Sequence, residues 1–112
     1  MPEHLMTLDD DPRDFIVWRQ GSGRSVEIFD IQIGSERRIG RGTKLVDKLL
    51  NSLRKGTTGG GVTTVYAITR HGNTIACQFY EKLGFRLCGR LHYFYTDEPG
   101  QHEHALVYAM DI

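Results

Sequence analysis

The stretch NTIACQFYEKLGF, residues 73–85, contains a short helix with both of its end signals. Asn73 is a favoured N-cap residue, because its side chain can accept a hydrogen bond from the first turn. Apolar residues then recur at the spacing of one helix face: Ile75, Ala76, Phe79, Tyr80 and Leu83. Gly84 can adopt the left-handed conformation that ends a helix, with Phe85 folding back on the last turn in a Schellman-like contact. We therefore predict a helix that starts after Asn73 and stops at Gly84.

A longer helix is predicted over residues 43–55. Its apolar positions form one stripe at helical spacing: Leu45, Val46, Leu49, Leu50 and Leu53. Gly56 ends this helix, and the glycine-rich residues 56–61 (GTTGGG) predict a flexible loop.

Strands are predicted on both sides of each helix. The apolar run 15–19 and the β-branched run 26–33 flank the turn residues 20–25 (QGSGRS), which indicates an antiparallel hairpin. Three further strands are predicted from their composition: residues 62–69, 86–95 and 105–112. The polar residues 96–104 are expected to separate the last two strands. A short additional strand near residues 4–8 is an option.

The predicted order of elements is β-β-α-β-α-β-β. Strand-helix-strand crossovers favour parallel pairing, whereas hairpins at the two ends favour antiparallel pairing. The sequence therefore predicts an α/β or α+β fold in which helices cover a mixed sheet.

Composition narrows the class of protein. The 112 residues carry fourteen Lys and Arg against fourteen Asp and Glu, and 39% are hydrophobic, which predicts a single domain over residues 1–112. No apolar run approaches the roughly 18 residues of a membrane helix, so we expect a soluble, cytoplasmic protein without membrane contact. Cys77 and Cys88 lack the spacing of a disulfide framework or a zinc site, so we expect reduced, buried thiols and no metal.

Residues 37–43 (RRIGRGT) lie between a predicted strand and the helix 43–55. Two close glycines let the backbone bring its N–H groups toward a ligand, and the helix start adds partial positive charge. The loop therefore predicts a phosphate site, although a plain strand-to-helix turn needs the same glycines. Neither a Walker A loop nor a dinucleotide fingerprint fits. Because residues 36–55 are locally basic in a neutral chain, a small multiply phosphorylated ligand suits them better than nucleic acid.

Both segments resemble motifs of the GCN5-related N-acetyltransferases. In that family a strand leads into an [Arg/Gln]-x-x-Gly-x-[Gly/Ala] loop, matched here by Arg37, Gly40 and Gly42. The more specific motif, NxxAxxFYxxxGF, is matched by six residues: Asn73, Ala76, Phe79, Tyr80, Gly84 and Phe85. The resemblance covers about residues 14–112. It implies a mixed, mostly antiparallel central sheet with helices on its faces.

The resemblance implies that acetyl-CoA is the cofactor. The loop would bind its pyrophosphate through backbone N–H groups and arginine charge: Arg37, Arg38, Ile39, Gly40, Arg41, Gly42 and Thr43. Ile31 and Ile33 would offer backbone groups to the pantetheine arm, in a cleft where two central strands splay apart. Asn73, Phe79 and Tyr80 would also contact the cofactor. Capping its own helix is the alternative role for Asn73.

The resemblance also assigns catalytic roles. Tyr80 would act as the general acid, giving a proton to the departing CoA thiolate; packing in the helix stripe is its alternative role. Glu27 is predicted to be the general base, because it lies six positions before Ile33, like the glutamate base of histone-acetylating relatives. Three other residues stay open as bases: Asp30, His71 and His92.

The acceptor is implied to be a primary amine, on a small molecule or on a protein. Relatives that acetylate protein N-termini carry Glu or His five residues before the motif asparagine, where this chain has Ile68, yet residues 93–95 and 104–106 resemble the tail of those enzymes. Full-length members begin with a strand and two helices that build much of the acceptor site, and only about 13 residues precede the first securely predicted strand here. We expect either an open cleft for a bulky amine or protein lysine, or completion by a second subunit in a homodimer.

We therefore expect an acetyl-CoA-dependent N-acetyltransferase that transfers the acetyl group directly to an amine. A non-catalytic module that binds CoA or acyl-CoA in a regulatory or docking role is the second hypothesis. A small RNA-associated protein is the third. The acidic residues 9–11 could attract a cationic acceptor or form a solvated terminus.

Overall fold

The computed structural model describes residues 3–8, 11–21, 23–34, 40–56, 61–98 and 101–112. The chain forms two compact units, residues 1–65 together with residue 112, and residues 66–111. The elements follow one another in the order β1-β2-β3-α1-β4-α2-β5-β6.

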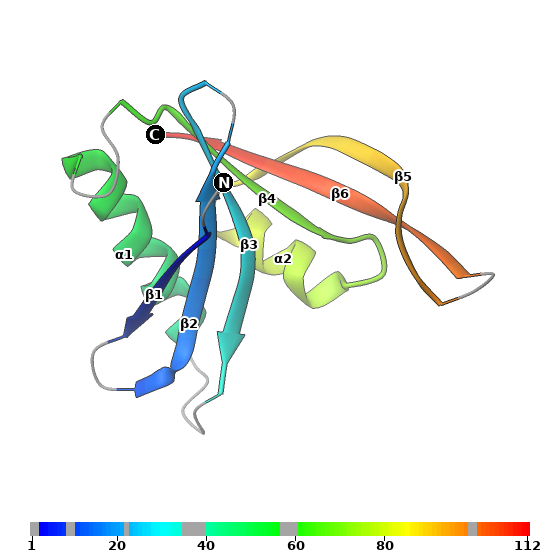
Figure 1. The fold of residues 1–112 in the computed structure, drawn as a ribbon, viewed down its shortest axis with the longest axis horizontal. Coiled ribbons are helices and arrows are strands. Elements are labelled where there is room, and N and C mark those ends of the chain that lie inside the picture. The colour runs from blue at the N-terminus through cyan, green and yellow to red at the C-terminus, as the bar shows by residue number, and fades with distance from the viewer. Residues whose placement is uncertain (1–2, 9–10, 22, 35–39, 57–60, 99–100) are drawn as a thin grey trace. The chain divides into compact units, whose positions relative to one another are not determined.

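The first unit is built on three antiparallel strands: β1 Glu3–Leu8, β2 Asp11–Gln20 and β3 Ser25–Ile33 (Figure 1). Leu5 pairs with Val17 between β1 and β2, and Ile16 pairs with Ile31 between β2 and β3. The predicted hairpin and the optional strand near residues 4–8 are both confirmed. Only residues 9 and 10 separate β1 from β2.

Helix α1, Arg41–Lys55, packs against all three of these strands. Its predicted apolar stripe is buried at every position: Leu45, Val46, Leu49, Leu50 and Leu53. Burying one such side chain stabilises a fold by about 1.5–3 kcal/mol, so the stripe holds α1 on the strands. The helix ends at Gly56, at a φ of 74°, where the N–H donates to the carbonyl of Leu53 at 3.1 Å, as predicted.

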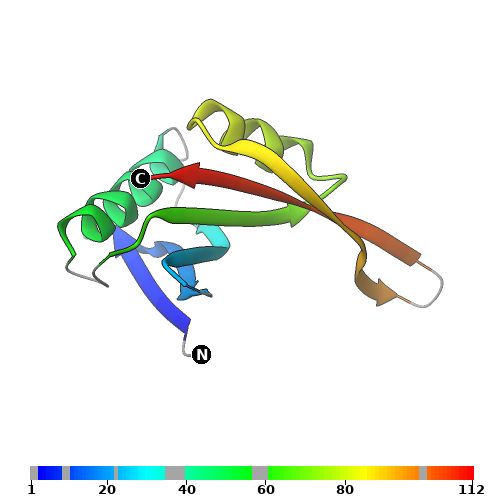
Figure 2. The ribbon, with the colours of Figure 1, turned by 90° about the horizontal axis from the view of Figure 1, so that it is seen from above.

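The second unit contains most of β4, Thr64–Arg70, followed by α2, Thr74–Lys82, and by a hairpin of β5, Arg86–Glu98, and β6, Gln101–Asp111. Strand β6 lies between β4 and β5 and pairs with β5 in the antiparallel direction. Helix α2 contacts β5. The twisted hairpin extends past α2 in both views (Figure 1, Figure 2).

The prediction that polar residues 96–104 separate the last two strands is wrong. Strand β5 continues to Glu98 and β6 starts at Gln101. Antiparallel pairing satisfies the backbone N–H and C=O groups of both strands whatever side chains they carry. A hairpin can therefore extend on polar residues, and polarity predicts exposure rather than the end of a strand.

The predicted apolar face of α2 is only partly buried, and the prediction of buried thiols is wrong for Cys88. Ile75, in the first turn of α2, is 82% exposed, and Tyr80, at 6% exposed, is the buried member of the predicted stripe. Cys77 is half-buried and Cys88 is exposed, although both are free thiols as expected. Cys88 lies where the pairing of β5 with β6 shifts register, so the alternation that would turn it inward is interrupted there.

The fold class is confirmed as a mixed α+β fold with mostly antiparallel strands. Helix α1 covers the strands of the first unit, and α2 contacts the hairpin of the second. In the part of the chain that the structure describes, no helix is long and apolar enough to cross a membrane.

Candidate functional site

The start of α1 presents the backbone of the predicted phosphate loop. Gly40 is the N-cap residue at a φ of 74°, its carbonyl accepts from the N–H of Lys44 at 3.0 Å, and its lack of a side chain leaves the first turn without a side-chain cap. Arg41, Gly42 and Thr43 form that first turn, where N–H groups and the helix dipole favour an anion. The other predicted loop residues lie outside the described residues: Arg37, Arg38 and Ile39.

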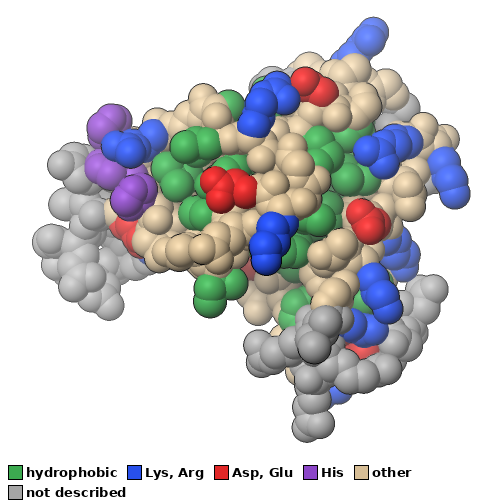
Figure 3. Space-filling view, turned by 180° about the vertical axis from the view of Figure 1, so that it is seen from behind, with side chains coloured by type: hydrophobic (Ala, Val, Ile, Leu, Met, Phe, Trp, Pro, Cys, Tyr) green, Lys and Arg blue, Asp and Glu red, His purple; other side chains and the backbone are tan. Residues whose placement is uncertain are grey.

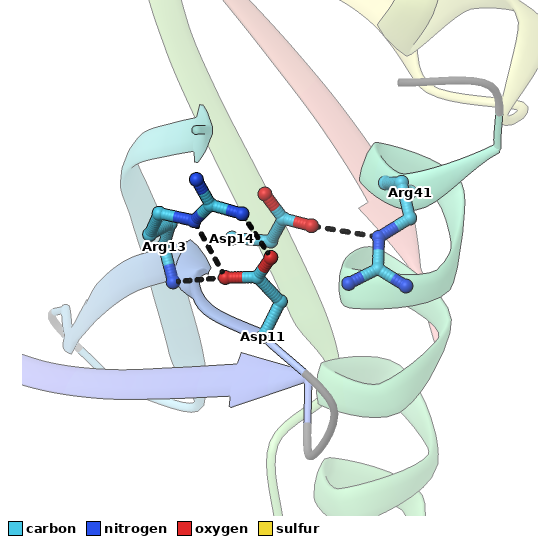
Figure 4. Close-up of polar contacts among 4 residues, drawn as sticks. All are labelled: Asp11, Arg13, Asp14 and Arg41. Carbon is cyan, nitrogen blue, oxygen red and sulfur yellow. Dashed lines mark hydrogen bonds and ion pairs between the residues drawn. The ribbon is translucent and has the colours of Figure 1, made fainter. Parts of the chain in front are cut away.

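The side chain of Arg41 is buried in an ion pair with Asp14 of β2 (Figure 4). Arg41 Nε lies 2.7 Å from Asp14 Oδ2, and the two side chains are 6% and 0% exposed. Its guanidinium thus binds the strand beneath the helix. What Arg41 can offer a ligand at the helix start is its backbone N–H.

The residue before Asp14 holds the other end of the same loop. The N–H of Gly34, at the end of β3, donates to the carbonyl of Arg13 at 3.1 Å. A Cβ on Gly34 would lie 2.9 Å from both Cβ and O of Arg13, so glycine is required for this close approach. The two described residues that border the loop, Gly34 and Arg41, are therefore bound to consecutive residues of β2, Arg13 and Asp14.

Arg13 is itself fixed by Asp11. The Asp11 carboxylate accepts from the backbone N–H of Arg13 at 3.0 Å and from its guanidinium at 3.0 and 2.8 Å (Figure 4). These hydrogen bonds lower the pKa of Asp11. Asp11, one of the acidic residues considered for attracting an acceptor, is thereby engaged within β2.

Asp14 was not among the residues predicted from the sequence. The signal that could have found it is the strand alternation, because Asp14, Ile16 and Trp18 are all buried on one face of β2. An aspartate in the core-facing register of a strand requires a buried partner. Arg41 supplies that partner from α1.

Strand β3 carries the predicted base and the predicted pantetheine contacts. The β2–β3 register shifts so that Phe29 is an extra residue, which bends the strand before the half-buried Ile31 and Ile33. Glu27 lies before this bulge, and its carboxylate pairs with Arg19 of β2 at 3.3 Å with the Glu27 side chain 19% exposed. The alternative base Asp30 accepts both of its hydrogen bonds from Gln32, at 3.1 and 3.0 Å.

In the second unit, Asn73 is the N-cap of α2, as predicted. Its Oδ1 accepts from the N–H of Ala76 at 3.1 Å. The side-chain Nδ2 takes no part in this cap and is the group that could donate to a cofactor. Cofactor contact by Asn73 stays a prediction.

The predicted Schellman contact that ends α2 is confirmed, and it fixes Tyr80. The N–H of Phe85 donates to the carbonyl of Tyr80 at 3.0 Å, the N–H of Gly84 donates to that of Glu81 at 3.1 Å, and Gly84 has a φ of 100°. The ring centroids of Tyr80 and Phe85 lie 5.3 Å apart.

Other aromatic rings complete the surroundings of Tyr80, which is 6% exposed. Phe79 lies 5.3 Å and Tyr108 of β6 6.0 Å from it, centroid to centroid. Burial and hydrogen bonding with Cys77 raise the pKa of Tyr108 to about 12, so this phenol keeps its proton. Sequence reasoning missed Tyr108, and alternation could not have found it, because Ala105, Leu106, Tyr108 and Ala109 bury both faces of β6.

His71, in the turn before Asn73, lies near two histidines of the hairpin, His92 and His104, and Figure 3 shows His side chains gathered on one side of the face in view. The His104 ring lies 4.8 Å from that of His92 and 6.3 Å from that of His71, centroid to centroid. Burial, followed by repulsion from His92 and Arg90, lowers the pKa of His104. Two of the alternative bases, His71 and His92, thus flank a histidine that resists protonation. Among the described residues, no set of His, Cys, Asp and Glu has the arrangement of a metal site.

The structure therefore gathers the predicted residues into two groups, one in each unit. The first contains Gly40 to Thr43, Glu27, Ile31 and Ile33, and the second contains Asn73, Phe79 and Tyr80. The cleft predicted between the two central strands stays a prediction.

Comparison with known proteins gives one family. The model of the acetyltransferase (GNAT) family matches residues 8–85. No curated protein matches the sequence.

Solved acetyltransferase structures resemble the chain. The ribosomal-protein-S18-alanine N-acetyltransferase of Escherichia coli is 25% identical, with a TM-score of 0.75 over 95% of this chain and 65% of that one. A Bacillus subtilis acetyltransferase in complex with CoA is 22% identical, with a TM-score of 0.78 over 98% and 76%. Arabidopsis thaliana NAA60 in complex with acetyl-CoA is 20% identical, with a TM-score of 0.72 over 92% and 67%. The chain thus spans less than two thirds of the E. coli enzyme.

Proposed function

Because the chain belongs to the acetyltransferase (GNAT) family, we propose that it transfers an acetyl group from acetyl-CoA to a primary amine. The observation that carries the proposal is the family match over residues 8–85, which contains the loop 37–43 and the whole of residues 73–85. Similar structures that hold CoA or acetyl-CoA support the choice of cofactor.

The proposed diphosphate site is the start of α1. Uncapped N–H groups at a helix start are donors for phosphate oxygens, and the helix dipole favours the negative charge. The buried stripe and the Asp14–Arg41 pair support this assignment, because they hold those N–H groups on a rigid element. Asn73, whose Nδ2 takes no part in its own cap, is proposed to contact the same cofactor.

In the proposed reaction, the amine nitrogen attacks the thioester carbon and the C–S bond breaks. An ammonium acceptor first loses one proton to Glu27, and the departing thiolate gains a proton from the Tyr80 phenol. The second proton that the nitrogen loses as the amide forms restores the phenol. The products are the N-acetylated amine, CoA with a free thiol, and one proton. The Schellman contact and the neighbouring rings support the role of Tyr80, because a general acid acts from a fixed position.

The proposed acceptor is bulky. Full-length relatives are expected to carry two helices after their first strand, and here β1 and β2 are joined by residues 9 and 10 alone. An acceptor site without those two helices would be open enough to admit a protein or peptide amine, or would be completed by a second subunit.

The test is thiol release from acetyl-CoA with a panel of polyamines, amino acids and peptides. Tyr80→Phe keeps the ring and removes only the hydroxyl, so kcat should fall by about 10²–10⁴-fold while the melting temperature changes little. Tyr108→Phe is the matched control, because it removes a second phenol from the same aromatic group and should retain most of the activity. Equal rates for Tyr80→Phe and the unaltered chain would contradict the assigned acid.

A non-catalytic acyl-CoA-binding module is the second candidate, and the short β1–β2 connection favours it. Calorimetry separates the two. Acetyl-CoA binding without acetylated product from any acceptor would support the module, and acceptor-dependent turnover would exclude it.

A further inference from the structure

The turn that carries Asn73 is fastened to β6. The N–H of Gly72 donates to Glu103 Oε2 at 2.8 Å, and the guanidinium of Arg70 donates to Glu103 Oε1 at 3.2 Å. The N–H of His71 donates to the carbonyl of His104 at 2.9 Å. Three consecutive residues before Asn73 are therefore bound by two consecutive residues of the hairpin.

Gly72 and Glu103 fit closely against each other. A Cβ on Gly72 would lie 2.7 Å from Glu103 Oε2, so the carboxylate occupies the space that a side chain would need. Within the turn, the N–H of Asn73 donates to the carbonyl of Arg70 at 3.0 Å, and the N–H of Thr74 donates to that of Gly72 at 3.0 Å. Glu103 thus binds residues that directly precede Asn73 and to which the backbone of Asn73 is hydrogen-bonded.

The charges around Glu103 favour its ionised form. The hydrogen bond from Gly72, followed by that from Arg70, lowers the pKa of Glu103, and the charge of His71 acts in the same direction. His104 directly follows Glu103 in β6, the His92 ring lies 4.8 Å from the His104 ring, and Arg90 acts on the same histidine. The Glu103 carboxylate is therefore charged at neutral pH, and the hydrogen bonds that it accepts are of the stronger, charge-assisted kind.

We propose that Glu103 is a positioning residue that holds the β4–α2 turn so that Asn73 can donate to the cofactor. The inference rests on the proposed function, because it takes acetyl-CoA as the ligand of Asn73. Glu103 does not touch the reacting atoms in this role. Its loss weakens cofactor binding and spares the chemical step.

The test compares Glu103→Ala with Asp111→Ala, a matched control on the same strand. Asp111 pairs with Arg86 at 3.1 Å, and both side chains are about two-thirds exposed, so its loss removes an ion pair without touching the turn. For Glu103→Ala, the Kd and KM for acetyl-CoA should rise by roughly 10-fold, the effect of losing the proposed hydrogen bond from Asn73 to the cofactor. Its kcat should stay within about twofold, and Asp111→Ala should match the unaltered chain.

A second variant guards against misfolding. Glu103→Gln keeps an oxygen for the N–H of Gly72 and loses the charge that binds Arg70. Its Kd for acetyl-CoA should therefore lie between that of the unaltered chain and that of Glu103→Ala. The amide resonances of Gly72 and Asn73 should shift in both variants before any ligand is added.

The possible failures are distinguishable. Absence of acetyl-CoA binding by the unaltered chain would overturn the proposed function and this inference with it. Normal binding by the unaltered chain and an equal Kd in both Glu103 variants would overturn the positioning role alone. A fall in kcat at constant KM would also overturn it, because Glu103 would then act in the chemical step.

Discussion

Replacing Asp14 with asparagine should destabilise the first unit by about 3–5 kcal/mol, the usual cost of removing one partner from a buried ion pair. The loss of stability should be this large because both partners of the ion pair are buried. The Asp14 side chain is fully buried, that of Arg41 is 6% exposed, and the Nε–Oδ2 distance is 2.7 Å. Without the carboxylate charge, the guanidinium stays buried on the face of β2 that also carries Ile16 and Trp18.

This loss is large for a small protein, whose total stability is typically about 5–15 kcal/mol. A loss of 3–5 kcal/mol changes the unfolding constant by roughly 10²- to several 10³-fold. Urea unfolding followed by fluorescence measures it locally, because Trp18 is the one tryptophan of the chain and lies 4% exposed in the same strand.

Two controls accompany Asp14→Asn. Arg86→Gln breaks an ion pair whose side chains are 63% and 67% exposed, and should cost about 0–1 kcal/mol. The double variant Asp14→Leu with Arg41→Met replaces both charges with apolar groups and should recover most of the stability. If Asp14→Asn costs no more than Arg86→Gln, or the double variant is less stable than Asp14→Asn, the argument from buried charge is refuted.

Three further predictions concern the second unit. Asn73→Ala should lower the stability by about 0.5–2 kcal/mol through the lost cap, as measured by thermal melts. Asn73→Asp should keep the stability and weaken acetyl-CoA binding, as measured by calorimetry. Equal binding by Asn73→Asp would leave Asn73 with the capping role alone. Gly84→Ala should cost about 1–2 kcal/mol, because the φ of 100° is unfavourable for alanine, and Gly89→Ala is the control without positive φ; equal unfolding midpoints for the two variants would contradict this reason. Lowering the pH from 7 to 5 should reduce stability, because the pKa of His104 is lowered in the folded state and the unfolded state takes up the proton first, below about pH 6.5. His104→Gln should make the stability measured by urea unfolding depend less on pH between 7 and 5. An unchanged pH dependence in this variant would contradict the role of His104.

The elements that the sequence predicts well are those whose signals are local. The cap at Asn73, the stop at Gly84 and the stripe of α1 each depend on residues within a few positions of one another. Hydrogen bonds between a helix and its own cap form in the same way whatever the rest of the chain does. The same holds for the hairpin of β2 and β3, which a turn between two apolar runs specifies.

What the sequence does not predict depends on partners distant in the chain. Asp14 and Arg41 are 27 residues apart, and Glu103 and Gly72 are 31 apart. Periodicity shows that Asp14 faces the core, and nothing local tells which cation from which element meets it. The extension of the last hairpin over polar residues is non-local as well, because the stabilising bonds are made to the opposite strand.

The loop between β3 and α1 is bordered by two residues, Gly34 and Arg41, that are bound to β2, and this bears on which of its arginines can face a phosphate. Fixing the two ends of a segment reduces the conformational entropy that remains to be lost on ligand binding. Gly34 and Arg41 provide these ends on adjacent residues of β2. In the proposed phosphate site, Arg41 would act through the backbone that it fixes, because its side chain is paired with Asp14 in the core. Any arginine charge at the phosphate would then come from Arg37 and Arg38, and a substitution in β2 that never touches the cofactor would weaken its binding.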